Sequence, residues 1–310
     1  MYFFLFFAVG LGLLIGGLLV MRSGLRHVFS PALAGLLGRL TVTPWRGLLA
    51  GAAGAALMQS STALTLTTVG LVSAEYLSFR QGLGLVLGAN IGTCSTVGLL
   101  ALDPPLPVLL ALLAASLLAA ALSRLRAAAL AVGGLAAMLT GVQLLSGALS
   151  GLSEAATVVR WLASAGQNPL AGIGGGILLT FLFQSSSAAT GLLMALADEG
   201  TIGLTAAAYG VYGNNIGSCL SSLVVGAAAP LAAKRVAMAH IVLNLAGVTV
   251  FLPFTALFVQ AAALLADGFA ARVAAMHTLF NIVSSLAVLP FAGAFASLVA
   301  LLVPGRDGGA

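Results

Sequence analysis

A polar motif occurs twice in this chain, and the two copies are 125 residues apart within strongly hydrophobic sequence. The first copy, Q-S-S-T-A-L-T, runs from Gln59 to Thr65, and the second, Q-S-S-S-A-A-T, runs from Gln184 to Thr190. A second pair keeps the same offset, with G-A-N-I-G-T-C-S-T at 88–96 and G-N-N-I-G-S-C-L-S at 213–221. Two motifs that recur in the same order without a gap indicate an internal duplication. The fold must therefore place two equivalent polar sites in apolar surroundings.

Hydrophobic residues make up 61% of the chain and charged residues 6%, a composition too apolar for a water-exposed exterior. Lipid is therefore the expected solvent. The apolar N-terminal segment lacks a preceding positive region, so we expect a first membrane helix and not a cleaved signal peptide. The 12 Lys and Arg residues are scattered and lack an aromatic–basic platform, so nucleic acid is excluded as a partner.

Segment lengths indicate where the chain crosses the bilayer, because an apolar helix of about twenty residues spans the hydrocarbon layer. We expect such helices at 1–21, 106–122, 127–149, 236–259 and 273–303. Only 47–58 separates Arg46 from the first Q-S-S motif, and only 172–183 precedes the second. Segments this short predict arms of re-entrant hairpins or halves of broken helices, with each Q-S-S motif at the break.

The Gly-flanked N-I-G segments are expected to interrupt the following apolar stretches in the same way. Four breaks in two matching pairs would line one shared central cavity, because irregular backbone at membrane depth must be buried in protein or lie beside water. The predicted fold class is an all-α polytopic membrane protein with two inverted repeats that meet at the midplane. We assign residues 1–310 to one transmembrane domain of roughly eight spanning or re-entrant elements. Its parts are repeat 1 at about 10–100, repeat 2 at about 135–225 and C-terminal helices at 233–303.

Charge asymmetry between the repeats predicts their inversion. The connection 22–46 carries four Arg residues and no acid, whereas the equivalent connection 147–171 carries only Glu154 and Arg160. Because positively charged connections favour the cytoplasmic side, the first connection is expected inside and the second outside. This orientation places the N-terminus outside the cell.

Hydroxyl clusters at helix starts predict an anion site. A helix N-terminus offers unpaired N–H groups and a partial positive charge, and serine hydroxyls add further donors. The first cluster would begin a helix at 63–74 and the second a helix at 188–197. The expected phosphate-binding residues are Ser60, Ser61, Thr62, Ser185, Ser186, Ser187, Asn90 and Asn215.

The same regions present side-chain oxygens that suit Na⁺, a hard cation. The expected Na⁺ ligands are Gln59, Gln184, Thr65, Thr190, Asn90, Thr93, Asn215 and Ser218. The motifs contain no Asp or Glu, and proton coupling usually relies on an intramembrane titratable group. Only His240 and His277 could take that part, so Na⁺ coupling is favoured over proton coupling.

A shorter internal echo pairs A-K-R-V-A-M-A-H-I-V-L-N-L at 233–245 with A-A-R-V-A-A-M-H-T-L-F-N-I at 270–282. It places His240 one helical turn from Asn244, and His277 one turn from Asn281. Two interpretations stay open for these residues, namely support of the site and interhelical hydrogen bonding. Cys94 and Cys219 occupy equivalent repeat positions and are expected to be small core or pocket-lining residues.

Catalysis is not expected, because the chain has no nucleophile elbow, no metal-spaced His, Asp or Cys set and no phosphate-binding Walker loop. Membrane serines usually serve as packing contacts, and that interpretation would suffice for one S-S-T. It does not account for two copies that share one offset and one spacing to N-I-G. Polar positions repeated in two apolar halves are instead typical of a transporter's substrate site.

These motifs resemble the sodium-dependent phosphate cotransporter family, comprising the type II class and its bacterial relatives. The family carries Q-S-S-S followed by G-[AS]-N-I-G-T in each inverted repeat, and this chain matches both over about 10–290. Its A-x-x-H-x-x-F-N pattern is met by Ala274–Asn281 and approximately by Ala237–Asn244, where Leu243 replaces Phe. Thr62 replaces the third serine of the first motif, and Asn214 and Ser218 vary the second N-I-G motif.

The resemblance implies a secondary active transporter that moves inorganic phosphate with Na⁺ across the cell membrane. Its partners would be phosphate, Na⁺, the lipid bilayer and, as a candidate, a second copy of the chain, and no organic cofactor is implied. Some bacterial relatives are associated with phosphate export, so the direction stays open. The alternatives are a phosphate exporter, a Na⁺-coupled carrier of another oxyanion, and a membrane protein that senses phosphate without transporting it.

Overall fold

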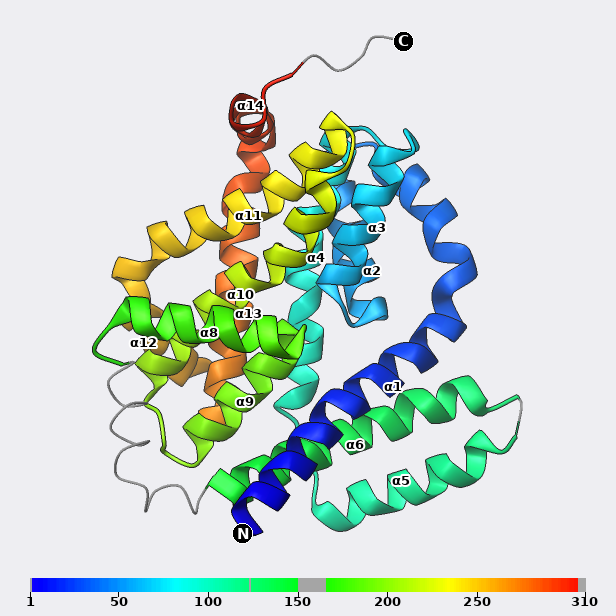
Figure 1. Ribbon diagram of the computed structural model, residues 1–310, viewed down its shortest axis with the longest axis vertical. Helices are drawn as coiled ribbons and strands as arrows, with labels where there is room; N and C mark the ends of the chain where they lie inside the picture. The colour runs from blue at the N-terminus through cyan, green and yellow to red at the C-terminus, as the bar shows by residue number, and fades with distance from the viewer. Residues whose placement is uncertain (1, 123, 150–165, 306–310) are drawn as a thin grey trace. The chain divides into compact units, whose positions relative to one another are not determined.

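The computed structural model describes residues 2–122, 124–149 and 166–305, and every regular element within these ranges is a helix (Figure 1). The all-α prediction is therefore confirmed. The α-helices are α1 (Tyr2–Leu40), α2 (Pro44–Met58), α3 (Ser61–Ser73), α4 (Phe79–Leu100), α5 (Leu106–Ala120), α6 (Arg126–Leu149), α8 (Pro169–Phe183), α9 (Ser186–Asp198), α10 (Leu204–Ala227), α11 (Leu231–Phe251), α12 (Thr255–Leu265), α13 (Phe269–Val288) and α14 (Ala292–Leu302).

Within the described residues, 5 stretches are long and apolar enough to cross a membrane. They are Phe4–Leu25, Phe79–Leu100, Arg126–Ala148, Leu231–Leu265 and Phe269–Leu302. These stretches agree with the prediction of a multi-pass membrane protein. The expected spans at 1–21 and 127–149 correspond to the first and third of these stretches. The first helix was predicted too short, because α1 continues past residue 21 to Leu40, and Pro31 lies within it without ending it.

The two C-terminal spans, expected to be continuous helices at 236–259 and 273–303, are each interrupted by a short 3-10 segment. The segments are Leu252–Phe254 between α11 and α12, and Leu289–Phe291 between α13 and α14. Both read Leu-Pro-Phe, and proline ends regular helix because it lacks an N–H and its ring clashes with the preceding turn. The internal echo therefore extends to the bend in each span.

The chain divides into two compact, interleaved units, which we describe separately. Unit 1 comprises residues 1–29, 97–214 and 255–277, and unit 2 comprises residues 30–96, 215–254 and 278–310. The core of unit 1 includes Leu14, Leu18, Leu145, Met194 and Val211. The core of unit 2 includes Leu64, Val86 and Val236 in one cluster and Leu48, Leu87 and Leu243 in another. Assignment of the whole chain to a single domain stays a prediction.

In unit 1, α1 packs antiparallel against α6 through small residues. A Cβ built at Gly17 would lie 2.7 Å from the Gly134 carbonyl oxygen, and one at Gly24 would lie 2.5 Å from that of Ala127. Gly10 likewise meets Gly141, so the contacts recur every seven residues along both helices. These two helices are related by the 125-residue offset. Their antiparallel contact is what an inverted repeat requires, although inversion of the whole repeat stays a prediction.

The orientation of the chain in the membrane is not tested. The argument for it depends on Glu154 and Arg160, which lie outside the described residues.

Candidate functional site

The first Q-S-S motif interrupts the helical backbone in unit 2, as predicted. α2 ends at Met58, and Gln59 adopts the left-handed conformation with φ of 50°. Ser60 is extended, and its hydroxyl accepts a hydrogen bond from the Ala63 amide at 3.1 Å, which caps α3. The helix was predicted to start at Ala63 but begins at Ser61, because Ser60 and not Thr62 provides the cap.

The second motif builds the same break in unit 1. Gln184 is left-handed with φ of 51°, and the Ser185 hydroxyl accepts from the Ala188 amide at 3.3 Å. α9 therefore starts at Ser186, two residues before the predicted start. The preceding helices also match, since α2 and α8 are each 15 residues long and each begins with proline after a side-chain cap, Thr43 or Asn168. Two separate stretches of sequence thus fold into one local design.

Each break forms a hairpin, because α2 packs against α3 and α8 packs against α9. A helix of 15 residues is about 22 Å long, shorter than the roughly 30 Å hydrocarbon layer. The prediction of arms too short to span the membrane alone is therefore confirmed for both hairpins. The second helix of each hairpin begins with a serine, Ser61 in α3 and Ser186 in α9.

The N-I-G segments do not break their helices, so the prediction of four breaks was wrong. α4 runs through 88–96 and α10 runs through 213–221 without interruption. The glycines instead permit close helix crossings. A Cβ at Gly88 would lie 2.8 Å from the Gly51 Cα, and one at Gly213 would lie 2.9 Å from the Gly176 Cα. These pairs are equivalent by the 125-residue offset, so each repeat makes the same crossing.

In unit 2, the first hairpin is linked to α4. The Gln59 amide nitrogen donates to the Ser95 hydroxyl at 3.2 Å, and Ser95 in turn donates to the Gly92 carbonyl at 2.8 Å. Asn90 of α4 and Thr65 of α3 are both buried. Neither Asn90 Nδ2 nor Thr65 Oγ1 has a hydrogen-bond partner among the described residues. A buried polar atom without a partner is costly in a folded protein, so these two atoms are candidates for contact with a ligand or water.

In unit 1, the equivalent hydroxyl is satisfied. Thr190 Oγ1 donates to the Ser186 carbonyl at 2.8 Å and lies 3.0 Å from the Asn214 amide, which also contacts Thr180 at 3.1 Å. All three side chains are buried. Repeat 1 has Ala55 and Ala89 at the positions of Thr180 and Asn214, which explains why Thr65 lacks the corresponding partner. The two half-sites therefore share a backbone design but differ in their polar side chains.

Unit 2 also holds Thr93, Asn215 and Ser218. Thr93 donates to the Ala89 carbonyl at 2.9 Å, and Ser218 donates to the Asn215 carbonyl at 2.7 Å. These predicted residues are buried, but the printed bonds tie their hydroxyls to their own helices. The remaining predicted residues, Gln184 to Thr190, belong to unit 1. Convergence of all predicted site residues on one cavity stays a prediction.

The His240–Asn244 pair lies between α10 and α11 in unit 2. His240 Nδ1 is 3.1 Å from the Ser222 hydroxyl, and Asn244 donates to the His240 carbonyl at 3.0 Å and to Cys219 Sγ at 3.3 Å. Cys94 and Cys219 are buried free thiols, as expected for small core residues. Of the two interpretations of this pair, these contacts favour interhelical hydrogen bonding. His277 and Asn281 are also buried.

Four acidic side chains gather in unit 1, and none of them belongs to a motif. Asp103, Asp198, Glu199 and Asp267 line a cavity of about 340 Å³ in unit 1, where Gln143 donates to Asp103 at 2.8 Å. Burial and the nearby charge of Asp198 raise the pKa of Glu199. These are four of the seven Asp and Glu residues in the chain, so they give this part of unit 1 a local negative potential.

Sequence reasoning missed several contacts around the motifs. It did not anticipate that Ser95 joins the first hairpin, that Ser222 contacts His240, or that Thr180 joins Asn214. Asn214 itself was visible as a departure from the family motif. Its role was hidden because Thr180 carries no motif of its own and lies on a different helix.

Comparison with known proteins gives a consistent result. A family model described as Na⁺/Pi-cotransporter matches residues 13–147 and again residues 137–292. "Uncharacterized protein YqeW" of Bacillus subtilis is 31% identical over 244 residues, which are 77% of this chain and 78% of that protein. "Putative inorganic phosphate export protein YjbB" of Escherichia coli K12 is 28% identical over 262 residues, which are 82% of this chain and 47% of that protein. The chain thus spans about half the length of YjbB, and no solved structure matches it.

Proposed function

Because the chain belongs to the Na⁺/Pi-cotransporter family, we propose that it is a secondary active transporter that moves inorganic phosphate together with Na⁺. The observation that carries this proposal is the duplicated hairpin, in which a left-handed Gln precedes a serine-capped helix start. The two matches to the family fall on the two repeats, and each match contains one hairpin.

Phosphate would bind at the starts of α3 and α9. The first amides of a helix have no partner within the helix, and the helix dipole adds partial positive charge. At α3 these groups belong to Ser61 and Thr62, and at α9 they belong to Ser186 and Ser187, whose side chains add hydroxyl donors. Such an arrangement suits a tetrahedral oxyanion, which can accept several hydrogen bonds without a full positive charge from the protein. Asn90 and Asn215 would complete the donor set.

Na⁺ would neutralise the bound anion. Neither motif contains a basic residue to balance phosphate, so cotransported cations offer that charge. Thr65 Oγ1 is the strongest candidate ligand among the described residues, because it is buried, carries an oxygen lone pair and has no partner. Gln59, Asn90 and Thr93 lie in the same unit, and Gln184, Thr190, Asn215 and Ser218 complete the candidate set. The acidic cavity of unit 1 would raise the local concentration of cations.

Uptake of radiolabelled phosphate into proteoliposomes tests the proposal. We expect accumulation with an inward Na⁺ gradient and none with an equal K⁺ gradient. Replacing Ser61 and Ser186 together by Ala should abolish the Na⁺-dependent component. Ser297→Ala is the matched control, because Ser297 is an exposed serine in α14 that donates to the Gly293 carbonyl. Unchanged uptake in the double variant would refute the assignment of the site.

The name of YjbB favours one alternative, in which the physiological direction is export. Efflux from phosphate-loaded vesicles with Na⁺ on either side measures the direction, and competition by sulfate, arsenate and vanadate measures selectivity among oxyanions. Phosphate binding without flux in either direction would instead indicate a phosphate sensor and would overturn the transport proposal.

A further inference from the structure

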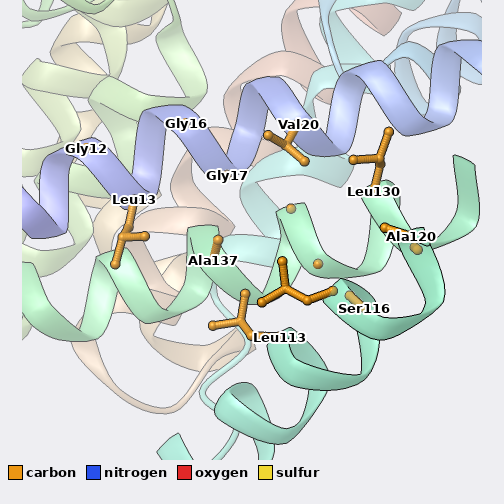
Figure 2. Close-up of a pocket in the computed structure, with 14 residues that line it drawn as sticks. Gly12, Leu13, Gly16, Gly17, Val20, Leu113, Ser116, Ala120, Leu130 and Ala137 are labelled. Atoms are coloured by element: carbon orange, nitrogen blue, oxygen red, sulfur yellow. The ribbon is translucent and has the colours of Figure 1, made fainter. Parts of the chain in front are cut away.

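An apolar groove lies between α1, α5 and α6 in unit 1, and its lining includes no residue of either Q-S-S motif. Its volume is about 300 Å³, at the lower end of the range for small-molecule pockets. Figure 2 shows Leu13 and Val20 from α1 facing Leu113 from α5 and Leu130 from α6 around this space. In Figure 1, α5 and α6 form a hairpin beside the N-terminal half of α1.

The groove exists because α1 presents glycines on this side. A Cβ built at Gly12 or Gly16 would meet nothing within 4 Å. The adjacent Gly17 is different, because its Cβ would collide with the backbone of α6 near Gly134. The face of α1 that carries Gly17 therefore packs against a helix, whereas Gly12 and Gly16 leave an open channel. A side chain at either open position would therefore start in the groove and not against a neighbouring helix.

The surroundings of the groove are those of a membrane-spanning segment. Two of its three walls come from the apolar stretches Phe4–Leu25 and Arg126–Ala148. Leu117, which also lines the groove, is 77% exposed to the exterior. The eight residues of α1 from Leu13 to Val20 give the groove a length of about 10 Å. An apolar groove of this kind offers dispersion contacts along its whole wall, so an apolar chain from the bilayer is the natural occupant.

Positive charge marks one end of the groove. The lining residues Ala120 and Ala129 lie beside the turn between α5 and α6, where Arg124 and Arg126 are both exposed. No Asp or Glu occurs between Asp103 and Glu154 in the sequence. Arg22 lies at the same end, since its neighbour Gly24 contacts Ala127. Two exposed guanidinium groups at the end of an apolar channel are complementary to a lipid with an anionic headgroup.

A polar group on the wall gives a second indication. Ser116 is 8% exposed and lines the groove. It lies one helical turn before Ala120, at the charged end of the groove, and its Oγ is close to Gly133. A hydroxyl on an otherwise apolar wall can donate a hydrogen bond to an acceptor on a ligand. An ester oxygen of a phospholipid, attached just below its phosphate, would supply such an acceptor.

We propose that this groove binds one acyl chain of an anionic phospholipid, with the phosphate group at Arg124 and Arg126 and an ester oxygen at Ser116. This inference is independent of the proposed transport function, because none of the groove residues belongs to either motif. The site would hold a lipid against the α1–α6 contact and the α5–α6 hairpin, and so would couple unit 1 to the composition of the membrane.

Native mass spectrometry of the detergent-purified protein tests the proposal with added phosphatidylglycerol and phosphatidylcholine. We expect the unchanged protein to retain one phosphatidylglycerol under activation that strips phosphatidylcholine. Gly16→Leu fills the groove and should weaken phosphatidylglycerol retention at least tenfold. The matched control is Gly98→Leu, because Gly98 is an exposed helical glycine whose Cβ also meets nothing within 4 Å. Gly12→Leu gives an independent test if Gly16→Leu is not recovered as folded, monodisperse protein.

The charged end is tested separately by replacing both arginines, Arg124→Gln and Arg126→Gln. An arginine near an anionic membrane surface contributes about 1 kcal/mol, so loss of both should reduce the preference for phosphatidylglycerol roughly tenfold or more. Binding of phosphatidylcholine should change little. Equal retention of phosphatidylglycerol by the unchanged protein and both groove-filling variants would overturn the proposal. So would loss of a dimer in those variants without any effect on lipid, since a second copy would then occupy the groove.

Discussion

Replacing Asn214 by Ala should destabilise the protein by removing a side-chain bridge between α8, α9 and α10 at the second hairpin. Asn214 is fully buried, and its amide lies 3.1 Å from Thr180 Oγ1 and 3.0 Å from Thr190 Oγ1. With the amide turned over, its nitrogen donates to the Gly176 carbonyl at 2.9 Å and its oxygen accepts from the Thr190 amide at 3.2 Å. This turned-over orientation satisfies both the nitrogen and the oxygen of the amide.

The size of the effect follows from the bonds that are lost. Interhelical hydrogen bonds in membrane proteins contribute about 0.6 kcal/mol on average and up to about 1.7 kcal/mol. The variant loses two such bonds and leaves the Thr180 hydroxyl buried without its partner, whereas Thr190 keeps its bond to the Ser186 carbonyl. The free energy of unfolding should therefore fall by about 1 to 3 kcal/mol.

Equilibrium unfolding in mixed micelles, followed by circular dichroism, gives the measurement. A double-mutant cycle with Thr180→Ala isolates the pairwise term, and we expect a coupling free energy of about 0.5 to 1.5 kcal/mol between Thr180 and Asn214. Ser222→Ala is a useful comparison, since Ser222 is a buried α10 residue whose bonds run to Cys219 and His240 instead. It should show no coupling to Thr180→Ala. Zero coupling between Thr180 and Asn214, with an unchanged unfolding midpoint, would refute the bridge.

Two further predictions concern the equivalent positions of repeat 1. Gly88→Leu should prevent normal packing of α4 on α2, because even its Cβ would lie 2.8 Å from the Gly51 Cα. The yield of monodisperse protein should therefore fall sharply, whereas the control Gly98→Leu should express normally. Equal yields of the two variants would contradict the close crossing of α2 and α4. Ala89→Asn should supply Thr65 with the amide that Asn214 gives Thr190, and the Na⁺ concentration for half-maximal phosphate uptake should rise several-fold. An unchanged Na⁺ dependence in folded protein would exclude Thr65 as a ligand of the coupling ion.

The helix breaks were predictable because their cause is local. Twelve apolar residues cannot span a bilayer, and serine after a polar residue provides a helix cap, so sequence alone located both hairpins. The start of each helix was misplaced by two residues, because any of several consecutive hydroxyl residues could have been the cap. The structure selects Ser60 and Ser185, which follow a left-handed Gln.

The N-I-G segments show what sequence could not supply. Glycine either loosens a helix or permits a close crossing, and the distinction depends on a partner elsewhere in the chain. The partner of Gly88 is Gly51, and the partner of Gly213 is Gly176, each 37 residues earlier. Gly51 and Gly176 belong to no motif, but they are themselves 125 residues apart. Comparison of glycine positions between the repeats could therefore have identified the crossings.

The bends in the C-terminal spans were a different omission. Leu-Pro-Phe occurs at 252–254 and at 289–291, in register with the echo that pairs His240 with His277. Proline inside an apolar stretch is a local signal for the end of a helix, so the bends at Pro253 and Pro290 were within reach of the sequence. Both spans were instead predicted from their hydrophobicity alone, and hydrophobicity does not reveal a three-residue interruption of the helix.

Differences between the two repeats indicate that phosphate and Na⁺, the two ligands of the proposed transporter, would need different groups from the protein. Both repeats keep the serine cap and the left-handed Gln, so both keep the donors that an oxyanion requires. Only repeat 1 leaves its threonine hydroxyl without a partner, because Ala89 stands where repeat 2 has Asn214. A buried oxygen already bonded to a protein amide is a poor ligand for Na⁺, since binding would first have to break that bond. Under the proposed function, phosphate would therefore depend on both helix starts, whereas a Na⁺ bound at this threonine position would depend on repeat 1 alone.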